Sequence, residues 1–479
     1  MRIHPSFVYP KTHHMNALKK LLFVFTVLSF QFAFSQGNRS SFSRDEVLED
    51  LDYLYRSLEE THFDLYAYTS KEEMQKHYDL LKKGIHQDSL SIKEITGLFQ
   101  TFTAKVKNGH TEVIFPVAQY LEYAEGGGTL FPLELVVEDG KALVRNNLTP
   151  LSELQKGTEI LSIDGTPIME VFKKLSATVS AERPYFKYTK AEIISFPRLY
   201  WQEYGSKARY EVVAKVNGEE IHKQIEAVPA LDGFELKRWD ILINAPKFKQ
   251  YKKVAYLNPG DFGGDLDQFK SFIDSAFTQI RTKKSPALII DLRFNSGGDD
   301  VYSDYLVSYI ADKPFQWNSS FELKSSAILK KHVRDNSDLT TEYAKSILGH
   351  KDGERFSFQF ESTLPQPKNK RYNGKVYVLV NRQSHSQSAV TAAQIQDYGF
   401  GKIVGEETGD SPSLYASQLT YTLPITGIPV KTAKGKITRV NGSKALQGVQ
   451  PDIFIRDHLR DDKDEILDGL LTRLEDGRP

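Results

Sequence analysis

The chain of 479 residues contains no cysteine. This absence excludes disulfide bonds, thiolate ligands for a metal, a thiol nucleophile and a lipidated N-terminal cysteine. An excess of charge is lacking as well, because Lys plus Arg and Asp plus Glu both number 62. No net field therefore draws the protein to nucleic acid or to anionic lipid. HExxH strings, glycosidase-like carboxylate pairs and phosphate-binding loops are also missing, so the sequence predicts no metal and no cofactor.

The N-terminus carries the pattern of an export signal. Two adjacent lysines precede an apolar run over residues 21–30, and Ala33 and Ser35 are small residues at the spacing of a signal-peptidase cut. We expect residues 1–35 to be a signal peptide. The alternative is a membrane anchor, but the run has about half of the ~20 residues that a span needs.

Met15 is the better start site, because the lysines then stand directly ahead of the apolar run, which leaves residues 1–14 open to being a spurious extension. No later stretch is long and apolar enough to cross a bilayer. We expect an exported protein, periplasmic or extracellular, that does not insert into the membrane after cleavage.

Two different patterns precede the C-terminal half. Serines followed by glutamate three residues later, at Ser43, Ser70 and Ser91, each open an amphipathic run, which predicts a helical N-terminal domain over residues 36–115. Short β-rich runs then predict a second domain over residues 116–235.

The most distinctive stretch of this second domain is Lys-Gly-Thr-Glu-Ile-Leu-Ser-Ile-Asp-Gly, residues 156–165. It resembles the Gly-Asp-x-Ile-Leu-x-Val-Asn-Gly stretch of PDZ domains, which hold peptide C-termini by strand addition. A purely structural β-hairpin explains the string equally well.

Residues 236–479 alternate strands and helices, which predicts an α/β domain with a largely parallel sheet. The continuous apolar runs 287–292 and 375–380 are typical of strands buried on both faces. Between residues 331 and 370 the chain is polar and charged, and its role as a lid or as a solvated excursion stays open.

Two strand-to-helix turns of this domain are the predicted site, because such turns at strand carboxyl ends hold ligands in α/β sheets. Ser386 stands at the start of a helix, where a hydroxyl is exposed and the helix amides favour developing negative charge. Gly297 and Gly298 in the other turn allow close approach of the backbone to a substrate. The competing interpretation is that Ser386 only caps its helix.

Four strings carry a resemblance to a known family, in the order Asp-Leu-Arg-Phe-Asn-Ser-Gly-Gly (291–298), Ser-His-Ser-Gln-Ser (384–388), Val-Gly-Glu-Glu-Thr (404–408) and Gly-Val-Gln-Pro-Asp (448–452). They are similar to motifs of the tail-specific, or C-terminal-processing, serine peptidases. The resemblance implies a crotonase-like (ClpP/crotonase) α/β catalytic domain with Ser386 as nucleophile. It assigns the oxyanion hole to Gly297, Gly298 and Gln387.

The general base departs from that pattern. The string that carries a catalytic lysine in the Ser-Lys branch has Ser411 at the lysine position. The Lys-Asn-Gly-His-Thr string around His110 is instead similar to the histidine turn of the tricorn-like branch, which implies His110 as base. The alternative is a loop histidine without a role. Possible supporting residues for His110 are Glu406, Asp397 and Gln447, between which spacing does not decide.

These observations predict an exported serine-type endopeptidase whose partners are unfolded or C-terminal peptide segments, with no nucleic-acid partner. The alternative is a catalytically inactive peptide-binding protein on the same fold, favoured by the missing lysine and by Gly109 and Gln447 at motif positions.

Overall fold

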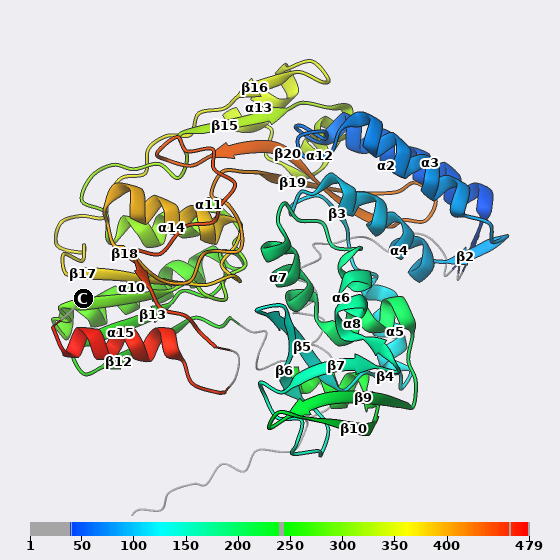
Figure 1. The fold of residues 1–479 in the computed structure, drawn as a ribbon. Coiled ribbons are helices and arrows are strands. Elements are labelled where there is room, and N and C mark those ends of the chain that lie inside the picture. The colour runs from blue at the N-terminus through cyan, green and yellow to red at the C-terminus, as the bar shows by residue number, and fades with distance from the viewer. Residues whose placement is uncertain (1–38, 40, 239–243, 459–460, 478–479) are drawn as a thin grey trace, which may run out of the picture.

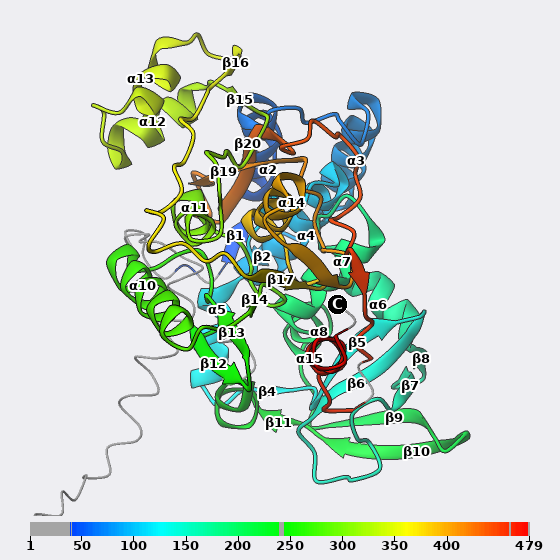
Figure 2. The ribbon, with the colours of Figure 1, turned by 90° about the vertical axis from the view of Figure 1, so that its left-hand side faces the viewer.

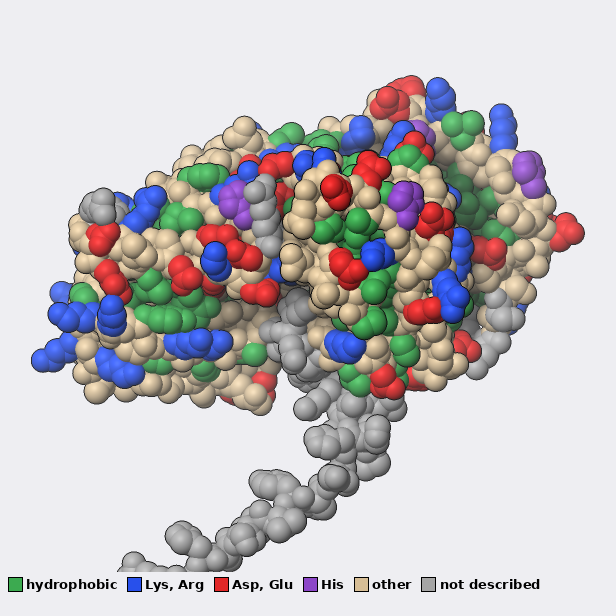
Figure 3. All heavy atoms as spheres, turned by 60° about the horizontal axis from the view of Figure 1, so that its bottom comes forward, with side chains coloured by type: hydrophobic (Ala, Val, Ile, Leu, Met, Phe, Trp, Pro, Cys, Tyr) green, Lys and Arg blue, Asp and Glu red, His purple; other side chains and the backbone are tan. Residues whose placement is uncertain are grey.

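A computed structural model describes residue 39 and residues 41–238, 244–458 and 461–477. The predicted signal peptide, residues 1–35, lies outside the described residues. Within the described ranges, no helix combines the length and the apolar character that crossing a bilayer requires. Acidic and basic side chains lie side by side over the face seen in Figure 3, in keeping with the zero formal net charge.

Three helices form the N-terminal part, and each begins at the predicted serine cap. Ser43 and Ser91 make complete capping boxes with Glu46 and Glu94, and Ser70 accepts the N–H of Glu73. The elements are β1 (Ser41–Ser43), α2 (Arg44–Thr61), α3 (Lys71–Gly84), β2 (Ser89–Ser91), α4 (Ile92–Thr103) and a 3₁₀ turn (Ala104–Val106).

The N-terminal helices share one hydrophobic core with a sheet from the C-terminal part of the chain. That sheet has the order β16-β15-β20-β19, and β3 (Glu112–Val113) pairs with β20. Val47 and Leu54 of α2 are fully buried in the same core as Leu419 and Val430. The strands are β15 (Ser320–Lys324), β16 (Arg355–Ser357), β19 (Leu414–Thr422) and β20 (Pro429–Thr438). Figure 1 shows this layer at the top of the molecule.

The polar stretch 331–370 is folded against this layer. It contributes to the helices α12 (Ala327–Asn336) and α13 (Glu342–Gly349), and its residues Val333 and Ile347 are buried in the shared core. The N–H of Ile328 donates to Glu60 on α2 at 3.0 Å. Ile328 lies just before the stretch, whose own buried residues pack into the core that the N-terminal helices share with the sheet.

The β-rich part forms an antiparallel sheet of order β10-β9-β7-β6-β5, with β8 beside β7. Helices α6, α7 and α8 lie on one side of it (Figure 1). Asp139 and Gly140 both have positive φ and close the β5–β6 hairpin. The elements are α5 (Val117–Glu125), β4 (Thr129–Leu130), β5 (Leu133–Glu138), β6 (Lys141–Asn147), β7 (Glu159–Ile163), β8 (Thr166–Pro167), α6 (Ile168–Ser176), α7 (Pro184–Ile194), α8 (Phe196–Tyr204), β9 (Arg209–Val216), β10 (Glu219–Glu226), β11 (Val228–Pro229) and a π-helical turn (Ala230–Glu235). The PDZ-like assignment of this part stays a prediction.

The remaining sheet, of order β12-β13-β14-β17-β18-β21, is parallel except for its edge strand β12. Every residue of β14 is buried, since helices α10, α11 and α14 cover one face and α15 the other (Figure 2). The elements are β12 (Lys247–Tyr251), β13 (Val254–Asn258), α10 (Leu266–Thr282), β14 (Ala287–Asp291), α11 (Asp300–Ser308), β17 (Lys375–Val380), α14 (Gln387–Tyr398), β18 (Lys402–Gly405), β21 (Ile453–Phe454) and α15 (Glu465–Glu475). The predicted α/β architecture is confirmed, and its crotonase-like topology stays a prediction.

Candidate active site

Ser386 occupies a strained position at the junction of β17 and α14. Its φ of 54° and ψ of −130° lie in a region that non-glycine residues rarely adopt, at a typical cost of about 1–3 kcal/mol. Its side chain makes no capping hydrogen bond to the helix, so the interpretation of Ser386 as a simple N-cap is wrong. The hydroxyl instead lies 3.0 Å from His110 Nε2.

His110 reaches this hydroxyl from a position 276 residues earlier in the chain. It lies within the turn from Asn108 to Thr111, which is closed by the hydrogen bond from Thr111 N–H to Asn108 O and which leads into β3. Because β3 pairs with β20, the histidine turn is attached to the sheet of the C-terminal part. Only 5% of His110 is exposed, and solvent does not compete for the imidazole.

Asp410 completes the arrangement and was not among the predicted supporting residues. Its Oδ2 lies 3.8 Å from His110 Nδ1 and accepts the N–H of Ser386 at 3.3 Å, while its Oδ1 accepts the N–H of Ser411 at 2.8 Å. The side chain is 2% exposed. The 3.8 Å separation exceeds hydrogen-bond length, and Nδ1 has no other partner among the described residues.

The three residues proposed from spacing lie elsewhere. Asp397 binds Arg439 through both carboxylate oxygens, at 2.8 and 2.9 Å, and is a structural ion-pair partner. Glu406 lies near Arg382, and burial raises the pKa of its carboxyl. Gln447 is exposed on the surface. The signal that was missed is the position of Asp410, directly before the serine that replaces the lysine of the Ser-Lys branch.

Burial sets the charge states of the imidazole and the carboxyl. Desolvation lowers the pKa of His110 to about 3, and the nearby charges of Lys190 and His385 act in the same direction. The imidazole is therefore neutral near pH 7 and able to accept a proton. Desolvation also raises the pKa of Asp410 well above its usual value, and the Glu182 carboxyl adds to the rise.

Of the paired glycines, Gly297 lies directly against the serine, and Gly298 lies against the backbone of Phe262. A Cβ on Gly297 would stand 2.7 Å from Ser386 Cβ and 2.8 Å from Gln387 N, and φ is +91°. The N–H of Gly297 already donates to Asn295 Oδ1 at 2.8 Å, so its predicted role as an oxyanion donor does not fit this arrangement. Within the described part of the chain, the N–H groups of Gly298 and Gln387 have no acceptor and are available to an oxyanion.

No group of three or more His, Asp or Glu side chains suited to a metal ion occurs among the residues that the structure describes. The contacts described above bring together a serine, an imidazole, a carboxyl and two backbone donors.

The region that holds Ser386 is similar to known proteins. Residues 253–455 match the family described as Peptidase family S41. Over 261 residues, the chain is 28% identical to the tail-specific protease of Haemophilus influenzae, a match that covers 51% of this chain and 32% of that protein. The chain thus spans about a third of the length of this relative.

Two solved structures share the fold over most of the chain. Mature CPAF has a TM-score of 0.64 at 15% identity, covering 90% of this chain and 96% of that one. Mature CPAF complexed with lactacystin has the same TM-score and identity, with coverages of 91% and 98%. The likeness therefore extends beyond the matched region to the β-rich part and the N-terminal helices.

Proposed function

We propose that this chain, whose residues 253–455 match peptidase family S41, is an exported serine endopeptidase with Ser386 as nucleophile and His110 as general base. The observation that carries the proposal is the 3.0 Å contact between Ser386 Oγ and His110 Nε2 at a strained helix start. Such strain persists where the surrounding structure enforces it, and it clusters at active sites.

The reaction is acyl transfer to water. Ser386 Oγ attacks the scissile carbonyl while His110 Nε2 takes its proton, and the imidazolium then returns that proton to the leaving amine. Water repeats the sequence on the acyl enzyme. The N–H groups of Gly298 and Gln387 stabilise the oxyanion of each tetrahedral intermediate.

Asp410 supports the charged imidazole. Once His110 is protonated, Nδ1–H faces the buried carboxylate, and we expect the 3.8 Å separation to shorten to a hydrogen bond. The raised pKa of Asp410 falls when a positive charge appears beside it, so imidazolium formation and ionisation of Asp410 favour each other.

We propose unfolded or C-terminal peptide segments as substrates. The similarity to a protein named tail-specific protease supports this class. The PDZ-like string, which includes the inner strand β7, supports this class further. PDZ domains bind an extended peptide as an added strand at a sheet edge. In this sheet the edge strands are β5 and β10.

Fluorophosphonate labelling tests the assignment without knowledge of the substrate. We expect the purified protein to label, and Ser386→Ala and His110→Ala to remain folded and unlabelled. Folded wild-type protein that stays unlabelled would favour an inactive peptide-binding protein instead.

Export is a separate proposal with its own test. Expression of the full chain followed by mass measurement of the accumulated protein should show loss of residues 1–35. Accumulation of the uncut chain inside the cell would contradict it.

A further inference from the structure

One segment of the β-rich part contacts both the turn that carries His110 and the turn that carries Asp410. The segment is 180–190, which enters and forms the first half of α7. Two residues of the segment contact the turn that carries Asp410. Arg183 donates to Gly409 O at 3.3 Å and pairs with Glu407 at 2.6 Å. Tyr185 donates to Glu407 O at 2.9 Å. Figures 1 and 2 both show α7 between the β-rich sheet and the rest of the molecule.

The same segment also contacts Asn108 and Gly109, the two residues just before His110. Ser180 Oγ lies 2.8 Å from Asn108 O and 3.2 Å from Asn108 N. Lys190 Nζ donates to Gly109 O at 2.7 Å. A Cβ on Gly109 would stand 2.5 Å from the Phe186 ring, so only glycine fits before the histidine.

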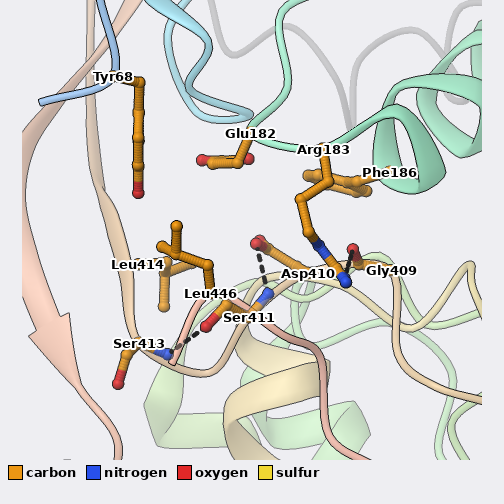
Figure 4. Close-up of a pocket in the computed structure, with 10 residues that line it drawn as sticks. All are labelled: Tyr68, Glu182, Arg183, Phe186, Gly409, Asp410, Ser411, Ser413, Leu414 and Leu446. Carbon is orange, nitrogen blue, oxygen red and sulfur yellow. Dashed lines mark hydrogen bonds between the residues drawn. The ribbon is translucent and has the colours of Figure 1, made fainter. Parts of the chain in front are cut away.

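Glu182 makes the most direct of these contacts. Its Oε1 accepts two hydrogen bonds, from Asn108 Nδ2 at 2.7 Å and from Gly109 N at 3.0 Å. Its Oε2 is buried and has no donor among the described residues. Figure 4 shows Glu182 and Asp410 on opposite sides of the small pocket that they line, so this side chain holds the residues before His110 and shares a pocket with Asp410.

We propose that Glu182 is a positioning residue for His110, an inference that rests on the proposed peptidase function. It touches no reacting atom. It fixes the backbone N–H that immediately precedes His110 and thereby the direction in which Nε2 points at Ser386. A displacement of about 1 Å at a catalytic group costs about a hundredfold in rate, which makes this single carboxylate oxygen important.

The neighbouring contacts make the proposal testable in a folded protein. Ser180 and Lys190 hold the same turn independently, so loss of Glu182 loosens the turn without removing all of its attachments. In Glu182→Gln the amide oxygen still accepts both N–H groups, and the amide nitrogen takes the place of the unpaired Oε2.

The experiment compares Glu182→Ala, Glu182→Gln and the control Glu203→Ala, which removes a carboxylate paired with Lys174 on the same part of the chain. We expect Glu182→Ala to lower the maximal rate of fluorophosphonate labelling about tenfold to a hundredfold at an unchanged half-saturating probe concentration. Glu182→Gln should stay within about threefold of wild type, as should the control. A wild-type rate in Glu182→Ala, or an equal loss in Glu182→Gln, would overturn the proposal.

A second readout separates this inference from the proposed function. Ring signals of ¹⁵N-labelled histidine, with His110 identified by the signal lost in His110→Gln, should change in Glu182→Ala and keep their wild-type positions in Glu182→Gln. Absence of labelling in the wild type would refute the peptidase assignment alone, whereas unchanged His110 signals in Glu182→Ala would refute the positioning role alone.

Discussion

Substitution of Asp410 by Asn tests the least expected member of the site. At the observed 3.8 Å, a full negative charge stabilises an imidazolium by about 4 kcal/mol if the effective dielectric constant is about 20. Since about 1.4 kcal/mol corresponds to tenfold in rate, we expect a loss of about a hundredfold to a thousandfold. The loss should grow as pH rises, because the raised pKa of Asp410 leaves part of the wild-type carboxyl protonated at lower pH.

The assay is the rate constant of fluorophosphonate labelling between pH 6 and pH 9, with circular dichroism to show that each variant is folded. Asp397→Asn is the matched control, because Asp397 is also buried but binds Arg439 instead of the histidine. Equal rates in wild type and Asp410→Asn at every pH would refute the role of Asp410. So would an equal loss in the control.

Three further outcomes follow from burial and sterics. Gly298→Ala should fail to fold or unfold at markedly lower urea concentration, because φ is +135° and a Cβ would stand 1.9 Å from Phe262 O; wild-type urea stability would contradict this. The pKa of His110 is lowered to about 3 from an unfolded value near 6.5, so its contribution to stability is present above pH 6.5 and is lost as pH falls toward 3. His110→Gln should therefore lose less stability than wild type over that range in acid titration, and parallel curves would contradict the assignment. Arg198→Met should cost about 3–5 kcal/mol in urea unfolding by leaving Glu235 buried without its ion-pair partner, and Glu235→Gln added to it should restore much of the loss.

Local features of this fold were predictable because they depend on neighbours in sequence. Each serine that caps α2, α3 or α4 interacts with the glutamate three residues later in the chain, whose backbone N–H it accepts. Burial of β14 on both faces follows from its uninterrupted apolar run. Ser386 and the paired glycines stand at turns between such elements.

The acid and the shared core were not predictable from spacing, because they depend on contacts between distant segments. Asp410 is brought to His110 by contacts such as the pairing of β3 with β20 and the hydrogen bond from Arg183 to Gly409 O. Gly109, a departure from the tricorn-like pattern, has its reason in the ring of Phe186, which lies 77 positions later in the printed sequence. Periodicity likewise gives the apolar face of α2 but not the sheet that covers it.

The separation of 276 residues between His110 and Ser386 has a consequence for the newly made protein. Synthesis delivers the imidazole long before the hydroxyl, and β20, which anchors the histidine turn, emerges later than either. Until Ser386 has been made, a nascent chain therefore has no pair of base and nucleophile, however much of its N-terminal part has folded. The strand that ties the histidine turn to the C-terminal sheet follows Ser386 in the chain, so the full attachment of His110 beside the hydroxyl forms only after residues 429–438 have been made.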